Sequence, residues 1–300
     1  MDSEYHIPVL LQESVDGLDI KKNGVYVDVT FGGGGHSAEI LKRLGDGGRL
    51  YAFDQDKDAA ENALNDPRFQ LIDQNFQYLK QFLKFYGIFE VDGILADFGV
   101  SSHQFDQPER GFSIRFDSEL DMRMSQNSSV TAFEVVNTYG ETELAAVLFR
   151  YGELRNANAM AKAIVGARKQ TSIRTTGQLK AVLQRFLPKA KENKILAQVY
   201  QAIRIEVNQE IEVLKAFLLQ VPEVLKKGGR LSVISYHSLE DRLVKRFIRA
   251  GKFEGEPEKD FYGNLKVPLK KVGGLIVPSA EEIAKNNRAR SAKLRIAEKL

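Results

Sequence analysis

Four short apolar runs alternate with helical patterns over the first hundred residues, and this alternation constrains the fold more than any other feature. The runs are rich in β-branched and aromatic residues and lie at 25–30, 49–54, 69–73 and 92–97. The helical patterns between them lie at 36–44, 57–65 and 75–86. Strands that alternate with helices in this way form a parallel sheet with helices on its faces. We therefore predict an α/β fold for this part of the chain.

The chain then carries far more residues than the next unit of such a sheet needs. A fifth apolar run at 230–235 follows a helical pattern at about 207–226, which Gly228 and Gly229 are expected to end. The 132 residues from 98 to 229 compare with roughly 30 for a complete β-α-β unit. About a hundred residues are therefore surplus to the sheet.

The surplus residues show one-faced helical patterns, in which apolar residues recur three, four and seven positions apart. These residues are Leu144, Val147, Leu148 and Tyr151; Leu179, Val182, Leu183 and Phe186; and Leu196, Val199, Tyr200 and Ile203. We predict an inserted all-α domain at 106–200, with 1–105 and 201–300 together forming the sheet domain. Two closing strands are expected near 265–270 and 292–298.

The composition is that of an ordinary folded protein. Hydrophobic residues make up 43% of the chain and charged residues 28%, as in globular domains. No run approaches the ~18 apolar residues of a membrane-spanning helix, and the start, MDSEYHIPVLL, lacks the basic region of a signal peptide. The chain contains no Cys, so disulfides, thiolate zinc sites and a Cys nucleophile are excluded. We expect a cytoplasmic protein without a membrane span.

The net charge of +3 hides an uneven distribution. Residues 1–104 carry 9 Lys and Arg against 17 Asp and Glu, whereas residues 105–205 carry 15 against 10 and residues 206–300 carry 19 against 13. Such asymmetry indicates an anionic partner of the later segments. Ordinary variation of solvated surface charge is the alternative.

Four consecutive glycines follow the first predicted strand and open the first predicted helix. Glycine lets a backbone approach a ligand closely, and a helix N-terminus offers N–H groups to an anion. Asp54 ends the second strand, 20 residues beyond Gly34, where a carboxylate can accept hydrogen bonds from ribose hydroxyls. Ligands bind at the carboxyl ends of such strands, so we expect Gly34, Asp54 and Asp97 to meet in one crevice. Its ligand would carry a ribose and an anionic group.

Two nucleoside cofactors fit this crevice. Gly33, Gly35 and Ala38 match a loosened form of the NAD fingerprint, whereas the carboxylate of S-adenosylmethionine would take the same place at the helix N-terminus. A tight turn without a ligand is a third interpretation. The carboxylate and small residues at 97–102 favour the methyl donor, because a dehydrogenase typically places a proton-transferring His or Lys there. His103 lies nearby and keeps the dinucleotide alternative open.

Five longer segments resemble those of one known family. They are VYVDVTFGGGGHS at 25–37, ILADFGVSSHQFDQPERGFSIRFDSELDMRM at 94–124, QAIRIEVNQE at 201–210, SYHSLEDRLVK at 235–245 and NNRARSAKLRIAEK at 286–299. In order and spacing they are similar to segments of the bacterial small-subunit rRNA cytosine N4-methyltransferases. The resemblance covers nearly the whole chain. It implies a class I, Rossmann-like methyltransferase sheet interrupted by a helical substrate-recognition domain.

The resemblance also implies a reaction and a set of cofactor contacts. The reaction would be methylation by S-adenosylmethionine of the exocyclic N4 of a decoding-centre cytosine of 16S rRNA, at position 1402 in the usual rRNA numbering. Carried over by motif, the cofactor contacts are Gly34, Gly35, His36, Asp54, Phe76, Asp97 and Gln104. Phe76 would stack beside the adenine, or would belong to the core. No metal site is expected, because the histidines show no ligand spacing.

Asp97 and His237 are the candidates for catalysis. A cytosine amine must be oriented toward the methyl carbon and relieved of a proton, and orientation alone is worth ~7 to 11 kcal/mol. Asp97, or backbone carbonyls at 98–101, would accept hydrogen bonds from the amine. Tyr236 and His237 would supply stacking and a proton relay, or would cap a helix that begins near Ser238.

The start of the predicted insertion interleaves cations with aromatic residues, a pattern suited to RNA. The residues expected to contact 16S rRNA, within a partly assembled small subunit, are Arg110, Phe112, Arg115, Phe116 and Arg123. A hinge that packs the insertion onto the sheet is the alternative. Two rival functions stay open for the chain: an NAD(P)-dependent oxidoreductase and an RNA-binding ribosome assembly factor without chemistry.

Overall fold

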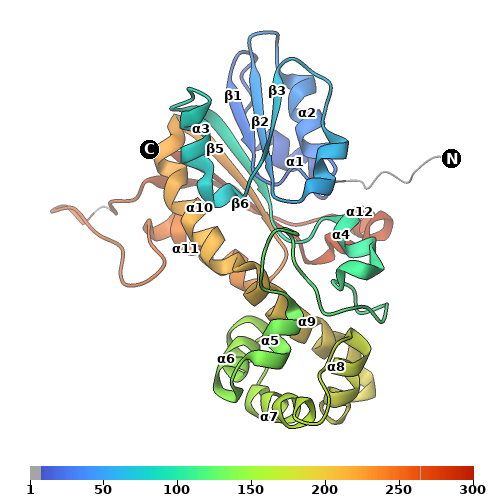
Figure 1. Ribbon diagram of the computed structural model, residues 1–300. Helices are drawn as coiled ribbons and strands as arrows, with labels where there is room; N and C mark the ends of the chain where they lie inside the picture. Colours follow the sequence, from blue (N-terminus) through green and yellow to red (C-terminus); the bar gives the residue numbers. More distant parts are fainter. Residues whose placement is uncertain (1–7, 264) are drawn as a thin grey trace. The chain divides into compact units, whose positions relative to one another are not determined.

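The chain divides into two compact units. A computed structural model describes residues 8–263 and 265–300. The first unit ends at Gly99 and resumes over Ile211–Leu300, and the second unit is Val100–Glu210. Figure 1 shows the sheet of the first unit and the helices of the second unit.

The first unit is built on a seven-stranded sheet in the order β3-β2-β1-β4-β5-β7-β6. Its strands are β1 (Val25–Asp28), β2 (Arg49–Asp54), β3 (Phe69–Asp73), β4 (Val91–Asp97), β5 (Leu225–Ser235), β6 (Leu269–Ile276) and β7 (Lys293–Lys299). The first five strands are parallel, and β7 lies antiparallel between β5 and β6. The predicted α/β fold with a parallel sheet is confirmed.

The position of β7 separates this sheet from the dinucleotide-binding sheet. The usual dinucleotide-binding order is 3-2-1-4-5-6, and its strands are parallel. Here an antiparallel strand is inserted between β5 and β6. The strand order reverses between β1 and β4, so the ligand crevice of such a sheet is expected at the carboxyl ends of these two strands.

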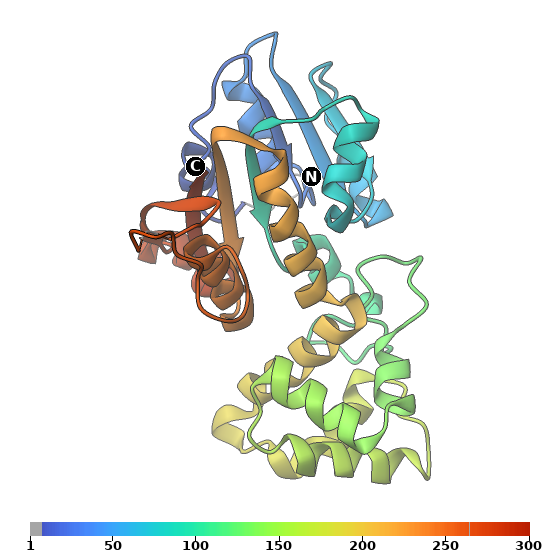
Figure 2. The same cartoon turned by 90° about the vertical axis from the view of Figure 1, so that its left-hand side faces the viewer.

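Helices cover both faces of the sheet. On one face, α1 (Leu11–Asp16) and α2 (Gly35–Arg43) pack their apolar side chains against β1, β2 and β4. On the other face, α3 (Leu79–Phe85), α10 (Glu210–Val224) and α11 (Ser238–Ala250) contribute to the largest core of this unit. Figure 2 shows the parallel strands between these layers from the side. Because both faces are covered, the central strands are apolar along almost their whole length.

Three of the predicted elements differ from the observed ones. Residues 57–62 form a 3₁₀ helix that Asp56 caps, where an α-helix over 57–65 was predicted. The strand predicted at 265–270 starts only at Leu269, because Pro268 lacks the N–H that a ladder needs. The glycines at 228 and 229 do not end a helix but lie inside β5, at a register shift against β4.

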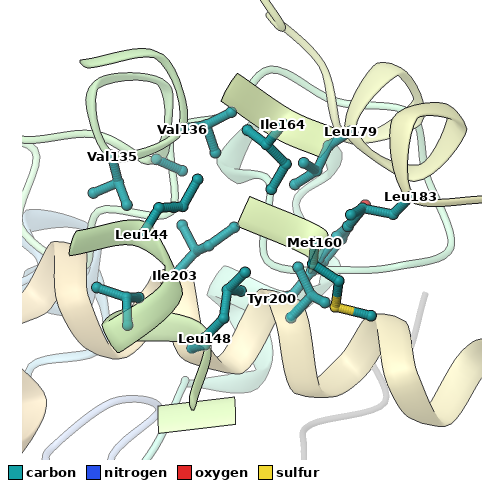
Figure 3. Close-up of a cluster of buried hydrophobic side chains, with 14 of the residues drawn as sticks. Val135, Val136, Leu144, Leu148, Met160, Ile164, Leu179, Leu183, Tyr200 and Ile203 are labelled. Atoms are coloured by element: carbon teal, nitrogen blue, oxygen red, sulfur yellow. The ribbon is translucent and has the colours of Figure 1, made fainter. Parts of the chain in front are cut away.

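The second unit is all α-helical around its own core. Its principal helices are α5 (Ala132–Thr138), α6 (Glu141–Gly152), α7 (Ala157–Arg168), α8 (Thr176–Leu183) and α9 (Glu192–Asn208). The side chains that Figure 3 labels point into one apolar cluster: Val135, Val136, Leu144, Leu148, Met160, Ile164, Leu179, Leu183, Tyr200 and Ile203. The three helical patterns of the sequence therefore supply much of this core.

The second unit extends beyond the predicted limits of 106 and 200. At its start, Val100 and Phe105 pack against the helical core. At its end, α9 continues through residue 200, and Ile203 and Val207 are buried in the same core. The boundaries at 100 and 210 follow from these contacts, which a pattern in the sequence does not reveal. In the part of the chain that the structure describes, no helix is both long and apolar enough to cross a membrane.

Neighbouring residues of α6 provide a test of this core. Leu148 is fully buried, whereas the next residue, Phe149, is 64% exposed. We expect Leu148→Ala to lower the free energy of unfolding by about 2 to 5 kcal/mol, because it leaves a cavity. Phe149→Ala should change it by less than about 0.5 kcal/mol. Urea denaturation followed by circular dichroism measures both, and equal effects would contradict the described packing.

Candidate active site

The glycine loop joins β1 to α2 at the carboxyl edge of the sheet. Gly34 caps α2 with φ 76° and ψ 6°, a left-handed conformation that glycine adopts without strain. A Cβ on Gly35 would lie 2.2 Å from Cγ of Pro8, so only glycine fits there. A Cβ on Gly33 would meet no atom within 4 Å. The loop therefore presents bare backbone to open space, beside the first-turn N–H groups that an α-helix leaves without intrahelical partners.

Asp54 at the end of β2 is bonded directly to this loop. Its Oδ2 accepts a hydrogen bond from the backbone N–H of Gly32 at 2.8 Å, and its Oδ1 accepts one from Asp56 at 2.9 Å. The side chain of Asn62 donates to the Gly32 carbonyl oxygen at 3.2 Å. Burial raises the pKa of Asp54 to about 6 in spite of these bonds. The predicted meeting of the glycine loop and Asp54 is therefore present in the structure.

Asp97 ends β4 on the other side of the loop. Its Oδ1 accepts a hydrogen bond from the hydroxyl of Tyr236 at 2.8 Å, and its backbone N–H donates to Oγ1 of Thr30 at 2.7 Å. Nδ1 of His36 lies 3.9 Å from its Oδ2. Burial raises the pKa of Asp97 to about 6, while His36 and Tyr236 act in the opposite direction. The Tyr236 hydroxyl therefore donates to this carboxylate, and Thr30 fixes the backbone of the same residue.

His36 is a buried residue whose ring lies between Val9 and Asp97. Its Nε2 lies 3.2 Å from the backbone carbonyl oxygen of Val9. A carbonyl oxygen only accepts, so Nε2 carries a hydrogen. The other ring nitrogen, Nδ1, is the one nearest Asp97. His36 therefore belongs to the carboxylate site rather than capping α2, whose cap is Gly34.

Asp28 is a site residue that the sequence analysis missed. It is fully buried at the end of β1, where it accepts hydrogen bonds from Oγ of Ser37 at 2.7 Å and from the backbone N–H of Thr30 at 3.1 Å. Burial raises its pKa. Its signal in the sequence is a lone charge inside the apolar run VYVDVT. Asp28, Asp54 and Asp97 together place three carboxylates at one edge of the sheet.

Tyr236 and His237 follow β5 and have different environments. Burial and the neighbouring Asp97 raise the pKa of Tyr236 well above its ordinary value of 10.0. His237 is the N-cap of α11, and its Nδ1 accepts from the backbone N–H of Glu240 at 3.4 Å. Its Nε2 lies 3.1 Å from Oε1 of Glu240, and Oε2 of the same carboxylate accepts from the backbone N–H of Tyr236 at 2.9 Å. The helix-capping alternative thus describes the observed contacts of His237, and Tyr236 is the residue that reaches Asp97.

Phe76 lies at the start of a 3₁₀ turn after β3 and is half-buried. Its ring centroid is 5.8 Å from that of Phe98 and 5.5 Å from that of Phe217. The ring is therefore part of an aromatic cluster at the edge of the core and keeps one exposed portion. Both interpretations of Phe76 stay compatible with this position.

Gln104 belongs to the second unit. It is buried in α4 (Ser102–Asp106), and its side-chain oxygen accepts from the backbone N–H of Ser101 at 3.2 Å. The backbone N–H of Gln104 in turn donates to Oγ of Ser101 at 3.1 Å. This reciprocal capping box fixes the start of α4.

Arg110 and Phe112 do not suit the predicted RNA contact. Arg110 is only 6% exposed, and its Nη2 donates to the backbone carbonyls of Arg123 at 3.0 Å and Met124 at 3.2 Å. Phe112 is buried in the helical core. A buried guanidinium bonded to backbone carbonyls offers little surface to a phosphate, so we correct this part of the prediction.

The remaining RNA candidates are more accessible. Arg123 is partly exposed and pairs with Asp121, with Nη2 at 2.7 Å from Oδ2. Arg115 is exposed, and the adjacent Phe116 is 44% exposed. Among the five candidates, Arg115 and Phe116 therefore offer the most surface to a nucleic acid.

The arrangement of the sheet domain suits a nucleoside ligand that carries both a negative and a positive group. The helix N-terminus favours an anionic group, Asp54 is placed for ribose hydroxyls, and the three carboxylates favour a cationic centre. A pyrophosphate would be repelled by the same carboxylates. Together with the strand order, these features define the protein as an α/β methyltransferase of class I.

Comparison with known proteins gives the family. The model of the MraW methylase family matches residues 3–300, so the chain belongs to this family. The chain is 68% identical over 297 residues to "Ribosomal RNA small subunit methyltransferase H" of Christiangramia forsetii, covering 99% of this chain and 98% of the relative. It is also 68% identical to the protein of that name from Flavobacterium johnsoniae, with the same coverage, and 58% identical to that from Cytophaga hutchinsonii, covering 98% of this chain and 99% of the relative.

The buried carboxylates predict a cost in stability at neutral pH. A pKa raised from 3.8 to about 6 means that the ionised Asp97 destabilises the native state above pH 6, by at most about 3 kcal/mol. We expect Asp97→Asn to raise the free energy of unfolding of the cofactor-free protein by about 1 to 3 kcal/mol at pH 7.5. The gain should shrink at pH 5.0, where the native wild-type carboxyl is protonated. Urea denaturation at the two pH values measures this difference.

The matched control is Asp73→Asn, which changes an exposed carboxylate at the end of β3. It should alter the free energy of unfolding by less than about 0.5 kcal/mol at either pH. Destabilisation by Asp97→Asn at pH 7.5 would show that the hydrogen bonds of this carboxylate outweigh its burial.

Proposed function

We propose that this chain transfers a methyl group from S-adenosylmethionine to the exocyclic N4 of a cytosine of 16S rRNA, at decoding-centre position 1402. The substrate would be a small ribosomal subunit in the cytoplasm. The observation that carries the proposal is the carboxylate of Asp97, which the Tyr236 hydroxyl holds beside the glycine loop, 3.9 Å from Nδ1 of His36. The names of the relatives and the motifs quoted above support the choice of base and RNA.

The residues of the sheet domain fit the cofactor. The backbone N–H of Gly35, at the start of α2, would bind its carboxylate, and Asp54 would accept hydrogen bonds from its ribose hydroxyls. Gly34 would contribute by forming the turn, since its own N–H donates to the carbonyl oxygen of Phe31 at 2.8 Å. Phe76 has an exposed portion that would lie beside the adenine. The cationic sulfonium complements carboxylates whose pKa values burial has raised.

The bound cofactor supplies an electrophilic methyl carbon, and the protein orients the amine. We propose that Asp97 accepts a hydrogen bond from an N–H of the cytosine amine, which directs the nitrogen lone pair toward that carbon. As the nitrogen–carbon bond forms and the carbon–sulfur bond breaks, the nitrogen becomes cationic and loses one proton. Asp97, with its pKa of about 6, accepts this proton.

Tyr236 is a positioning residue in this scheme, because it acts through Asp97. Tyr236→Phe removes one hydrogen bond to a charged group, a loss of about 1.5 to 3 kcal/mol, so we expect kcat to fall about 10- to 100-fold. The hydroxyl also lowers the pKa of Asp97. Its removal should therefore move the acid limb of the kcat/KM profile to higher pH, with little change in the Kd for S-adenosylmethionine.

Steady-state kinetics between pH 5 and 9 and calorimetry measure these effects. Tyr262→Phe is the matched control, since Tyr262 is 86% exposed on a loop, and it should leave the rate and the profile unchanged. An unshifted acid limb in Tyr236→Phe would remove Tyr236 from the mechanism.

The RNA would be recognised in part by the second unit. Arg115 and Phe116 are exposed next to each other in sequence, a cation and an aromatic ring that suit a phosphate and an unstacked base. A base must leave its stack to reach a methyl donor in a crevice.

The decisive experiment follows the methyl group. Small subunits from cells that lack this modification are incubated with the protein and methyl-labelled S-adenosylmethionine, and the 16S rRNA is digested and mapped by mass spectrometry. We expect one labelled N4-methylcytosine at position 1402. Label at another base, or no label in 16S rRNA, would contradict the proposed function.

A further inference from the structure

A pocket lies in the first unit between α11, β6 and β7, and none of the residues assigned to the cofactor site lines it. It has a volume of about 320 Å³, within the range of small-molecule sites. β6 is the last strand of the sheet, so the pocket lies at the edge of the sheet. Its apolar lining includes Ile248, Val267 and Leu269. Its charged lining consists of Lys245, Arg249, Lys270, Lys271 and Arg295.

All five charged residues of this lining are cations, and two of them have carboxylate partners. Arg295 donates to Asp241 at 2.7 and 3.2 Å, and Lys270 lies 2.7 Å from Glu298. The other three are Lys245, Arg249 and Lys271, and none of them forms an ion pair with a residue that the structure describes. The pocket therefore keeps three uncompensated positive charges around an apolar floor.

The three cations come from two elements that face each other. Lys245 and Arg249 are exposed one turn apart on α11. Lys271 is opposite Ala297 of β7, whose side chain belongs to the core that α11 covers. Like charges so arranged repel one another, and an anionic ligand between them would remove that repulsion.

The loop before β6 does not supply the missing anion. It carries four carboxylates, at Glu254, Glu256, Glu258 and Asp260. None of these carboxylates lines the pocket. The residue of this loop that does line it is Val267. The pocket is therefore open to an anion from outside the described chain.

We propose that this pocket, lined by Lys245, Arg249 and Lys271 over an apolar floor, binds a nucleotide of the substrate RNA that flanks the methylated cytosine. The three cations would bind phosphates, and the floor would contact the sugar or base. This inference rests on the proposed function, since it needs an RNA substrate.

The position of α11 supports a flanking nucleotide. The helix begins directly after Tyr236 and His237, at the end of the sheet where Asp97 lies. Arg249 is 11 residues beyond Ser238, which is about 16 Å along the helix axis. One RNA strand that extends a few nucleotides from the target base would span this distance.

The test removes the three charges together. In the variant K245Q/R249Q/K271Q, we expect the KM for unmodified small subunits to rise at least about tenfold. The slope of log binding affinity against log salt should decrease by about 2, the value for three phosphate contacts on a single strand. The Kd for S-adenosylmethionine and kcat at saturating subunits should stay within about twofold, because the cofactor site is untouched.

The matched control is K22Q/K84Q/K227Q, which removes three exposed cations near the amino-terminal ends of β1, β4 and β5, none of which lines the pocket. It lowers the net charge equally and should change the KM and the salt slope much less. Equal effects of the two variants would overturn the proposal, because they would reflect net charge alone.

Two further outcomes would overturn the pocket assignment. An altered sedimentation coefficient in the pocket variant with an unchanged KM would assign the pocket to a contact between copies of this chain. An unchanged KM with unchanged sedimentation would leave the pocket without a role in RNA binding. These outcomes can be told apart from a failure of the proposed function. In that case the wild-type protein itself would place no label in 16S rRNA.

Discussion

The candidate site depends on the burial of three carboxylates at the carboxyl edge of the parallel sheet. Asp28, Asp54 and Asp97 end three strands that lie next to each other, and burial raises the pKa of each. Backbone N–H groups, hydroxyls and His36 compensate only part of this cost. In the proposed function, the cationic methyl donor would offset the remainder, so stability that the empty site lacks would contribute to binding of the donor.

The end of β5 connects this site to the rest of the first unit. Glu240 accepts a hydrogen bond from the backbone N–H of Tyr236 and lies 3.1 Å from Nε2 of His237. These two contacts fix the start of α11. Tyr236 then reaches across to Asp97. The same helix carries Lys245 and Arg249 at its far end. One helix therefore orients the carboxylate site and presents the cations that we assign to flanking RNA.

The sequence predicted the convergence of Gly34, Asp54 and Asp97 because parallel strands end at a common edge. It did not predict that Arg110 and Phe112 are buried. A sequence pattern of cations and aromatic residues is the same whether the side chains face solvent or pack in a core. The bonds from Arg110 to two backbone carbonyls depend on how residues 123 and 124 fold back. Asp28 was missed because a single charged residue in a predicted strand can be exposed or buried, and only the structure shows that Asp28 is fully buried.

The sequence by itself determined the alternation of strands and helices, the helical insertion and the glycine loop, because these depend on local periodicity and on the conformations open to glycine. Only the tertiary structure decided where the insertion starts and ends, that β7 runs antiparallel between β5 and β6, and that Tyr236 rather than His237 contacts Asp97. These features arise from packing and hydrogen bonds between residues far apart in the chain. The burial of a side chain, which affects its pKa and decides which cations form ion pairs, depends on the whole folded chain.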